Sequence, residues 1–281
     1  MYLLGGKDLK NILKTIINCL SALFIMTLIN GLSPLIGIIP FIGMKDLGYT
    51  LSNLLILALT FLFVYSCITK GIRDNLSTYR ITKPYFKKEW FFLGIIALII
   101  MYLGFFIITN GIWENGSIKN IPVFIIVIVI TSFSTAMSEE LFFRGLLLGY
   151  LEKYTNTYWG LIISSILFSI VHTMNGDFDL KNIIQINVGI FIAGLCYGLL
   201  AIYYKTIWSS IVIHFMFDIT QLFDITTKQN NQSIVEYVYS SSSQLITGGQ
   251  YGSTVSIITI LAFLVIVLYL IYKMKTSFYL R

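Results

Sequence analysis

The sequence predicts an all-α fold, a polytopic membrane helix bundle of about eight transmembrane helices. Of the 281 residues, 57% are hydrophobic and only 11% are charged, whereas soluble proteins carry about 25% charged residues. Apolar stretches of about 20 residues recur along the whole chain, and a helix of this length crosses the hydrocarbon core of a bilayer. These observations exclude an ordinary soluble domain.

Eight apolar stretches give the expected helices. They cover about residues 12–29, 49–69, 90–110, 121–151, 158–174, 183–204, 207–223 and 253–272. Pro122 lies at the start of the fourth stretch, where its missing N–H costs least. We expect three parts: N-terminal helices without a motif (1–110), a catalytic core (111–230), and an outer loop followed by the last helix (231–281).

The lysine and arginine residues are strongly biased toward one side of this bundle. If the N-terminus is cytoplasmic, the inner segments contain fourteen of them: Lys7, Lys10, Lys14, Lys70, Arg73, Arg80, Lys83, Lys87, Lys88, Lys153, Lys205, Lys273, Lys275 and Arg281. The outer segments contain four: Lys45, Lys119, Lys181 and Lys228. Because cytoplasmic loops are enriched in these residues, both termini are predicted inside and the connection 224–253 outside.

The same charge bias explains the net charge of +6. No basic run alternates with aromatic residues on one face, so we expect a lipid bilayer and no nucleic acid as a partner. The cysteines Cys19, Cys67 and Cys196 each lie inside an apolar stretch. We therefore expect them to pack, without forming disulfides or a metal site.

Six ionisable residues lie well inside the predicted spans, and only in the fourth, fifth and seventh. They are Glu139, Glu140, Arg144, His172, His214 and Asp218. A charged residue at mid-bilayer costs about 2.5–3.5 kcal/mol on insertion scales. The two histidines are also the only ones in the chain. Because their placement in the bilayer is unfavourable, we expect these residues to have a function.

Helical spacing places these residues on common faces. Residues three, four or seven apart share a face, which predicts the polar seams Ser132–Thr135–Glu139, Glu140–Arg144, Phe168–His172 and Ser210–His214–Asp218–Gln221. Such seams on apolar helices are typical of a water-containing cavity. Glu139 and His172 lie level, because each is about 14–15 residues, or roughly 21–24 Å, from the turn near 153–157. His214 reaches that level only if this helical hairpin extends past the membrane.

These residue types favour hydrolysis of an amide bond. A carboxylate near a histidine can activate water as a general base. A second histidine with its helical neighbour can stabilise an oxyanion or hold a metal ion. Arg144 would neutralise one of the two adjacent carboxylates. A divalent metal such as zinc, held by Glu139, His172, His214 and Asp218, is an open alternative to metal-free chemistry.

Two further classes of function compete with an enzyme. A proton- or ion-coupled transporter would use the histidines and carboxylates as a relay, but the chain has no second half that repeats the first. A non-catalytic membrane protein that confers immunity by binding a bacteriocin or its receptor would use the same fold. A purely structural role for all six residues is disfavoured by their concentration on three helices.

Three elements resemble the CAAX protease and bacteriocin-processing family of intramembrane proteases, also called the CPBP or Abi family. They are E-E-x-x-x-R (Glu139, Glu140, Arg144), F-x-x-x-H (Phe168, His172) and H-x-x-x-N/D (His214, Asp218). All three occur in the family's order and on separate spans. The resemblance covers about a third of the chain, from 121 to 223.

The resemblance implies an eight-span endopeptidase whose site opens toward the cytoplasm. Glu139 would activate the water with the assistance of His172, and His214 with Asp218 would stabilise the oxyanion or bind a metal. Family members that cleave prenylated tails have Asn at the position of Asp218, and an ionised Asp cannot donate as Asn does. Asp218 would therefore be protonated, ligate a metal, or orient His214.

The sequence thus predicts an endopeptidase of a bacterial plasma membrane. It would act on a peptide or protein tail near the cytoplasmic face, in peptide maturation or bacteriocin self-immunity. Nothing in the sequence indicates that a prenyl group is recognised.

Overall fold

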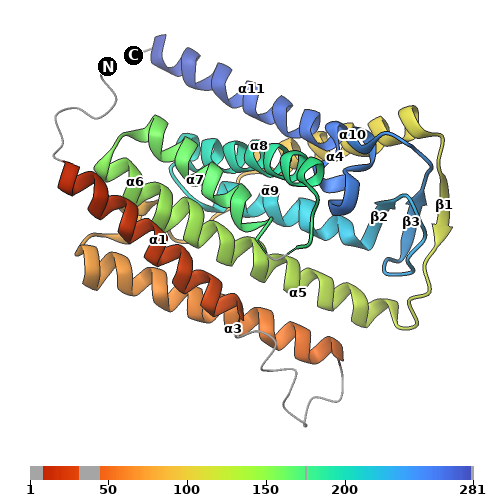
Figure 1. Cartoon of the computed structure of the whole chain (residues 1–281), viewed down its shortest axis with the longest axis horizontal. Coiled ribbons are helices and arrows are strands. Elements are labelled where there is room, and N and C mark those ends of the chain that lie inside the picture. The colour runs from red at the N-terminus through yellow and green to blue at the C-terminus, as the bar shows by residue number, and fades with distance from the viewer. Residues whose placement is uncertain (1–8, 32–44, 175, 280–281) are drawn as a thin grey trace.

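The computed structural model describes residues 9–31, 45–174 and 176–279. It is a helix bundle with a small sheet at one end, and both described ends of the chain lie at the other end (Figure 1). Lys7 and Arg281, which contribute to the predicted orientation, lie outside the described residues. The polytopic helical bundle expected from the composition is confirmed.

Six helical segments in the described part of the chain are long and apolar enough to cross a membrane. Four are single helices: α1 (Leu9–Gly31), α4 (Lys88–Thr109), α8 (Leu180–Tyr204) and α11 (Ile257–Tyr279). The two remaining segments are composite: α3 (Lys45–Ser66) with the π turn η1 (Cys67–Ile72), and α5 (Ile121–Glu140) continued by η3 (Leu141–Leu147) and α6 (Leu148–Tyr154). The protein is therefore a multi-pass membrane protein.

Two of the eight expected spans are short helices. They are α7 (Thr157–Val171), with 15 residues, and α9 (Trp208–Asp218), with 11. At about 1.5 Å per residue, neither is as long as the hydrocarbon core of roughly 30 Å. Each stops at a polar residue inside the bundle, α7 at His172 and α9 at Asp218. The expected span 207–223 therefore extends five residues past the end of α9, whereas the expected span 158–174 is close to α7.

Side-chain caps fix where several helices begin. Asn120 accepts a hydrogen bond from the backbone N–H of Val123 at the start of α5, and Asn156 accepts one from Trp159 at the start of α7. Asp179 accepts from Asn182 at the start of α8. Each cap satisfies a backbone donor that has no partner within its own helix.

The connections at one end of the bundle form a three-stranded sheet, where the sequence predicts loops. The strands are β1 (Ile112–Asn115), β2 (Phe223–Thr226) and β3 (Val235–Val238), in the order β1-β3-β2. The β1–β3 pair is antiparallel and the β2–β3 pair is parallel. The short helix α10 (Gln244–Thr247) and the 3-10 turns η5 (Gly249–Tyr251) and η6 (Ser253–Val255) lead into α11. Four-residue strands are too short to show a clear alternating pattern.

At the end of the bundle opposite the sheet, polar contacts hold the segment between α3 and α4 against α6. Arg80, just after the 3-10 turn η2 (Leu76–Tyr79), forms an ion pair with Glu152 of α6. Lys153 pairs with Asp74 at 2.9 Å, and this contact lowers the pKa of Asp74. The turn that joins α6 to α7 is thereby fixed to the segment containing Arg80.

Candidate active site

A π turn separates the two acidic residues of α5 from α6. The turn η3 spans Leu141–Leu147 and directly follows Glu140, and all seven of its residues are buried. π turns within α-helices frequently mark functional sites because they change the direction of the side chains that follow. Here the turn contains Arg144 and keeps it beside Glu140.

Glu140 and Arg144 form the expected pair inside the bundle. Arg144 Nη1 lies 3.1 Å from Glu140 Oε1, and the two side chains are 2% and 0% exposed. Arg144 Nη2 donates a hydrogen bond to the backbone carbonyl of Gly194 in α8 at 3.3 Å. The guanidinium also stacks over the ring of Phe168 at 4.0 Å. Such stacking favours a buried cation through the negative face of the ring.

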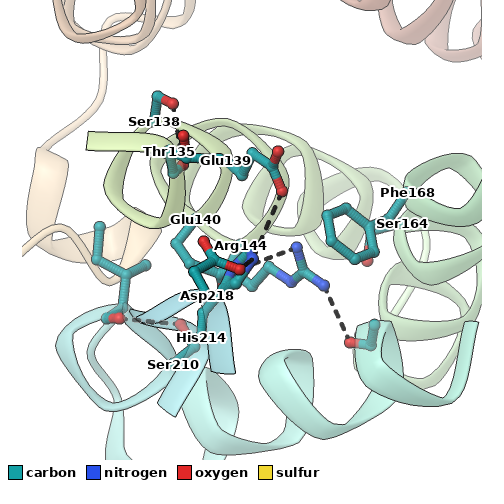
Figure 2. Close-up of polar contacts among 12 residues, drawn as sticks. Thr135, Ser138, Glu139, Glu140, Arg144, Ser164, Phe168, Ser210, His214 and Asp218 are labelled. Carbon is teal, nitrogen blue, oxygen red and sulfur yellow. Dashed lines mark hydrogen bonds and ion pairs between the residues drawn. The ribbon is translucent and has the colours of Figure 1, made fainter. Parts of the chain in front are cut away.

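His214 of α9 is the meeting point of the carboxylates. Its Nδ1 donates a hydrogen bond to Glu140 Oε1 at 3.0 Å. On the other side of the ring, Nε2 lies 3.7 Å from Glu139 Oε2 and 3.7 Å from Asp218 Oδ1. Figure 2 shows the side chains of Glu139, Glu140, His214 and Asp218 pointing toward one another between α5 and α9. Together with Arg144, which pairs with Glu140, five of the six predicted residues therefore lie in one cluster.

The ring of His214 is held by an aromatic residue that the sequence analysis does not single out. Tyr197 of α8 stacks on it with a centroid distance of 4.5 Å and an interplanar angle of 14°. An aromatic residue in an apolar span is ordinary, so its sequence position gives no signal. Tyr197 and the backbone of Gly194 are the contributions of α8 to the cluster.

His172 joins the site through Phe168. Its Nδ1 donates to the carbonyl of Phe168 at 2.7 Å, so Nε2 is the ring nitrogen left for another partner. The Phe168 ring contacts both histidines, with centroid distances of 4.6 Å to His172 and 6.2 Å to His214. Among the described residues, no ion pair within 4.0 Å joins His172 to Glu139. The histidine that Glu139 approaches is His214.

Two cavities meet at His172. One, of about 260 Å³, is lined by His172, His214 and Asp218 and by residues of α4, α8 and β2. The other, of about 280 Å³, is lined by Glu139 and His172 and, on the side of α1, by Leu23, Met26, Thr27 and Asn30. Both histidines are therefore accessible from the first cavity, while Glu139 borders the second.

The predicted polar seams only partly face these cavities. Asp218 and Gln221 line the first cavity, as expected. Thr135 instead donates a hydrogen bond to Asn53 of α3 at 3.3 Å. The stripe before Glu139 thus faces a neighbouring helix, because spacing on one helix does not tell which neighbour a face meets.

The expected metal ligands are only partly brought together, because Glu139 and Asp218 approach His214 and no ion pair joins His172 to them among the described residues. Zinc binds nitrogen and oxygen ligands at about 2.0–2.2 Å. Within residues 9–31, 45–174 and 176–279, no group of three His, Cys, Asp or Glu side chains is placed to hold an ion. His172 lies apart from the cluster around His214, and a metal stays a prediction.

Residues 121–220 match the protein family described as type II CAAX prenyl endopeptidase Rce1-like. This segment is Rce1-like. The match is consistent with the resemblance to the CAAX protease and bacteriocin-processing family. The Rce1-like segment begins with α5 and ends two residues after Asp218, so it contains all six predicted site residues. No curated protein and no solved structure matches this chain.

The family is one of proteases, so the Rce1-like segment indicates a membrane hydrolase that acts on a peptide or protein. The helices α1, α3 and α4 lie before the Rce1-like segment in the sequence, and α11 lies after it. Nevertheless, α1 and α4 contribute walls to the two cavities.

Proposed function

We propose that the protein is an intramembrane endopeptidase that hydrolyses a peptide bond with a water molecule activated by Glu139. The observation that carries this proposal is the pair of 3.7 Å separations from His214 Nε2 to Glu139 Oε2 and Asp218 Oδ1. These separations are too long for direct hydrogen bonds. A water molecule about 2.8 Å from each of the three atoms fits that spacing.

Burial distinguishes the two adjacent carboxylates. The side chain of Glu139 is 24% exposed and that of Glu140 is fully buried. Glu140 is already engaged by Arg144 and by His214 Nδ1. Glu139 Oε2 and Asp218 Oδ2 are buried and have no hydrogen-bond partner among the described residues. Glu139 is therefore the better general base, and Glu140 orients His214.

The proposed hydrolysis of the peptide bond is balanced in atoms and in charge. Glu139 takes a proton from the water while the water oxygen bonds to the carbonyl carbon of the substrate. A protonated His214 donates from Nε2 to the oxyanion that forms, while Glu140 stabilises the imidazolium through Nδ1. The C–N bond breaks as Glu139 returns the proton to the leaving nitrogen.

His172 is proposed to position the substrate or the water. Its Nδ1 is engaged by Phe168, and the residue borders both cavities. This role differs from direct assistance to Glu139, which the resemblance implies. It predicts that His172 acts on substrate binding as well as on the rate of the chemical step.

The proposed setting is a bacterial plasma membrane, with peptide maturation or bacteriocin self-immunity as the context. The test compares the peptides of cells that produce the intact protein with those of cells that produce Glu139→Ala, by mass spectrometry. We expect specific cleavage products to disappear in the variant. A variant that gives unchanged peptides but retains bacteriocin protection would instead support a non-catalytic immunity protein.

Asp218→Asn separates metal from metal-free chemistry. Without a metal, Asn can donate to the oxyanion, so we expect the variant to keep full cleavage activity in a chelator. If Asp218 ligates a divalent metal such as zinc, the variant should bind the ion more weakly and lose activity. The measurement is peptide cleavage by purified Asp218→Asn in detergent, with and without chelator. Loss of activity that added zinc restores would overturn the metal-free mechanism.

A further inference from the structure

The cavity that contains His214 and Asp218 opens toward the end of the bundle that carries the sheet. Its deep wall includes Tyr197 and His214, which are 3% and 7% exposed. Toward the sheet, its lining includes the exposed residue Gln221 and Phe223, which is 48% exposed. Ser253, from the turn before α11, also borders it. The lining thus passes from buried to exposed residues in the direction of β2.

An apolar cluster closes the opposite side of the site. Leu141, Ile207 and Ile211 are each 1% exposed and pack together, and Ile81 and Trp208 lie against them. Leu141 directly follows Glu140, and Ile211 lies one helical turn before His214 on α9. The cluster therefore fills the space between the catalytic residues and the turn that precedes α9.

Backbone and side-chain hydrogen bonds fix the segment that covers this cluster. The N–H of Ile207 donates to the carbonyl of Arg80 at 3.0 Å, and Trp208 Nε1 donates to the carbonyl of Thr82 at 3.1 Å. The hydroxyls of Thr82 and Thr206 lie 2.7 Å apart. A peptide that approached from this side would have to break all three contacts and displace the apolar cluster.

The basic residues mark the closed end. Within the described part of the chain, the residues near it are Lys14, Lys70, Arg73, Arg80, Lys83, Lys87, Lys88, Lys153, Lys205, Lys273 and Lys275. In Figure 1 the start of α1 and the ends of α6 and α11 lie at this end, opposite the strands. By the rule that cytoplasmic segments are rich in Lys and Arg, the closed end faces the cytoplasm.

We propose that the substrate peptide reaches the catalytic residues from the extracytoplasmic side, through the opening beside β2. This inference rests on the proposed endopeptidase function and replaces the expectation of a site that opens toward the cytoplasm. The substrate class is then a peptide or protein segment exposed at the outer face of the membrane. The cytoplasmic side of the site is sealed by Leu141, Ile207 and Ile211 beneath the segment around Ile81.

Cysteine labelling tests this direction of access. In a chain whose native cysteines are replaced by Ala, Gln221→Cys places a thiol at the opening, and Ser253→Cys is a second position there. Ser77→Cys, on an exposed residue of η2, is the matched control at the closed end. A bulky, membrane-impermeant maleimide is added to intact cells and to permeabilised cells. Cleavage is measured as the amount of the peptide products that disappear in the Glu139→Ala variant.

We expect the reagent to label Gln221→Cys in intact cells and to lower its cleavage at least tenfold relative to the same unlabelled variant. Ser77→Cys should be labelled only after permeabilisation, without loss of cleavage. Labelling of Gln221→Cys and Ser253→Cys only in permeabilised cells, or full labelling with unchanged cleavage, would overturn the inference. Absence of cleavage by the wild-type chain would contradict the proposed function, and external labelling would still establish the side on which the cavity opens.

Discussion

Glu139→Gln is expected to lower peptide cleavage by about 10²- to 10⁴-fold, the range that general acid–base groups contribute. Gln has almost the same shape as Glu but cannot accept a proton from the water. Glu139 makes no direct hydrogen bond to His214, because the 3.7 Å separation is too long. The folded protein should therefore keep its stability. The measurements are the cleavage rate of the purified protein in detergent and its thermal unfolding temperature.

Glu114→Gln is the matched control for this substitution. Glu114 lies on β1, in the sheet and outside the membrane-spanning helices. Cleavage by this variant should equal that of the wild type. Equal cleavage by Glu139→Gln and Glu114→Gln would remove Glu139 from the chemical step and leave the proposed mechanism without a base.

Arg144→Ala is expected to destabilise the folded protein by about 3–5 kcal/mol, the cost of leaving one member of a buried ion pair without its partner. The substitution leaves Glu140 fully buried beside His214 without its cation. It also removes the stacking on Phe168 and the hydrogen bond to Gly194. We expect a lower unfolding temperature in detergent, a lower yield in membranes and the loss of cleavage.

A double-mutant cycle separates the ion pair from the other contacts of Arg144. Because Glu140→Ala/Arg144→Ala leaves no unpaired charge in the pair, it should be less destabilised than the sum of the two single variants. A single Arg144→Ala variant that unfolds at the wild-type temperature would show that the pair contributes nothing to stability. Additive single effects would show that Glu140 and Arg144 do not act together.

Local spacing predicts part of the site well. The Glu140–Arg144 contact follows from a separation of four residues on one helix, and it survives because η3 remains helical through Arg144. His214 and Glu139 approach within 3.7 Å and so lie at one level, which the sequence predicts only if the hairpin of α6 and α7 extends past the membrane. These relations depend on the geometry of single helices.

Relations between helices were less accessible from sequence. Spacing along one helix does not tell which neighbour a helix face meets. Thr135, which spacing predicts to face the cavity, contacts Asn53 of α3 instead. Nor does spacing reveal that Tyr197 stacks on His214, because aromatic residues are common in apolar spans. The end of α9 at Asp218 could not be found from hydropathy, because Ile219, Leu222 and Phe223 keep the segment after it largely apolar. The sheet was missed because its strands pair segments far apart in the chain.

Substitutions of the residues around the ring of Phe168 are expected to depend on one another. Arg144 Cζ lies 4.0 Å from the centroid of this ring, and the rings of His172 and His214 lie 4.6 and 6.2 Å from it, centroid to centroid. Residues that share a partner do not respond to substitution independently. An earlier amino-acid substitution at one of these positions should therefore determine which substitutions the other positions tolerate. Chains that diverge here are expected to do so by linked replacements around the ring, with few viable single steps between them.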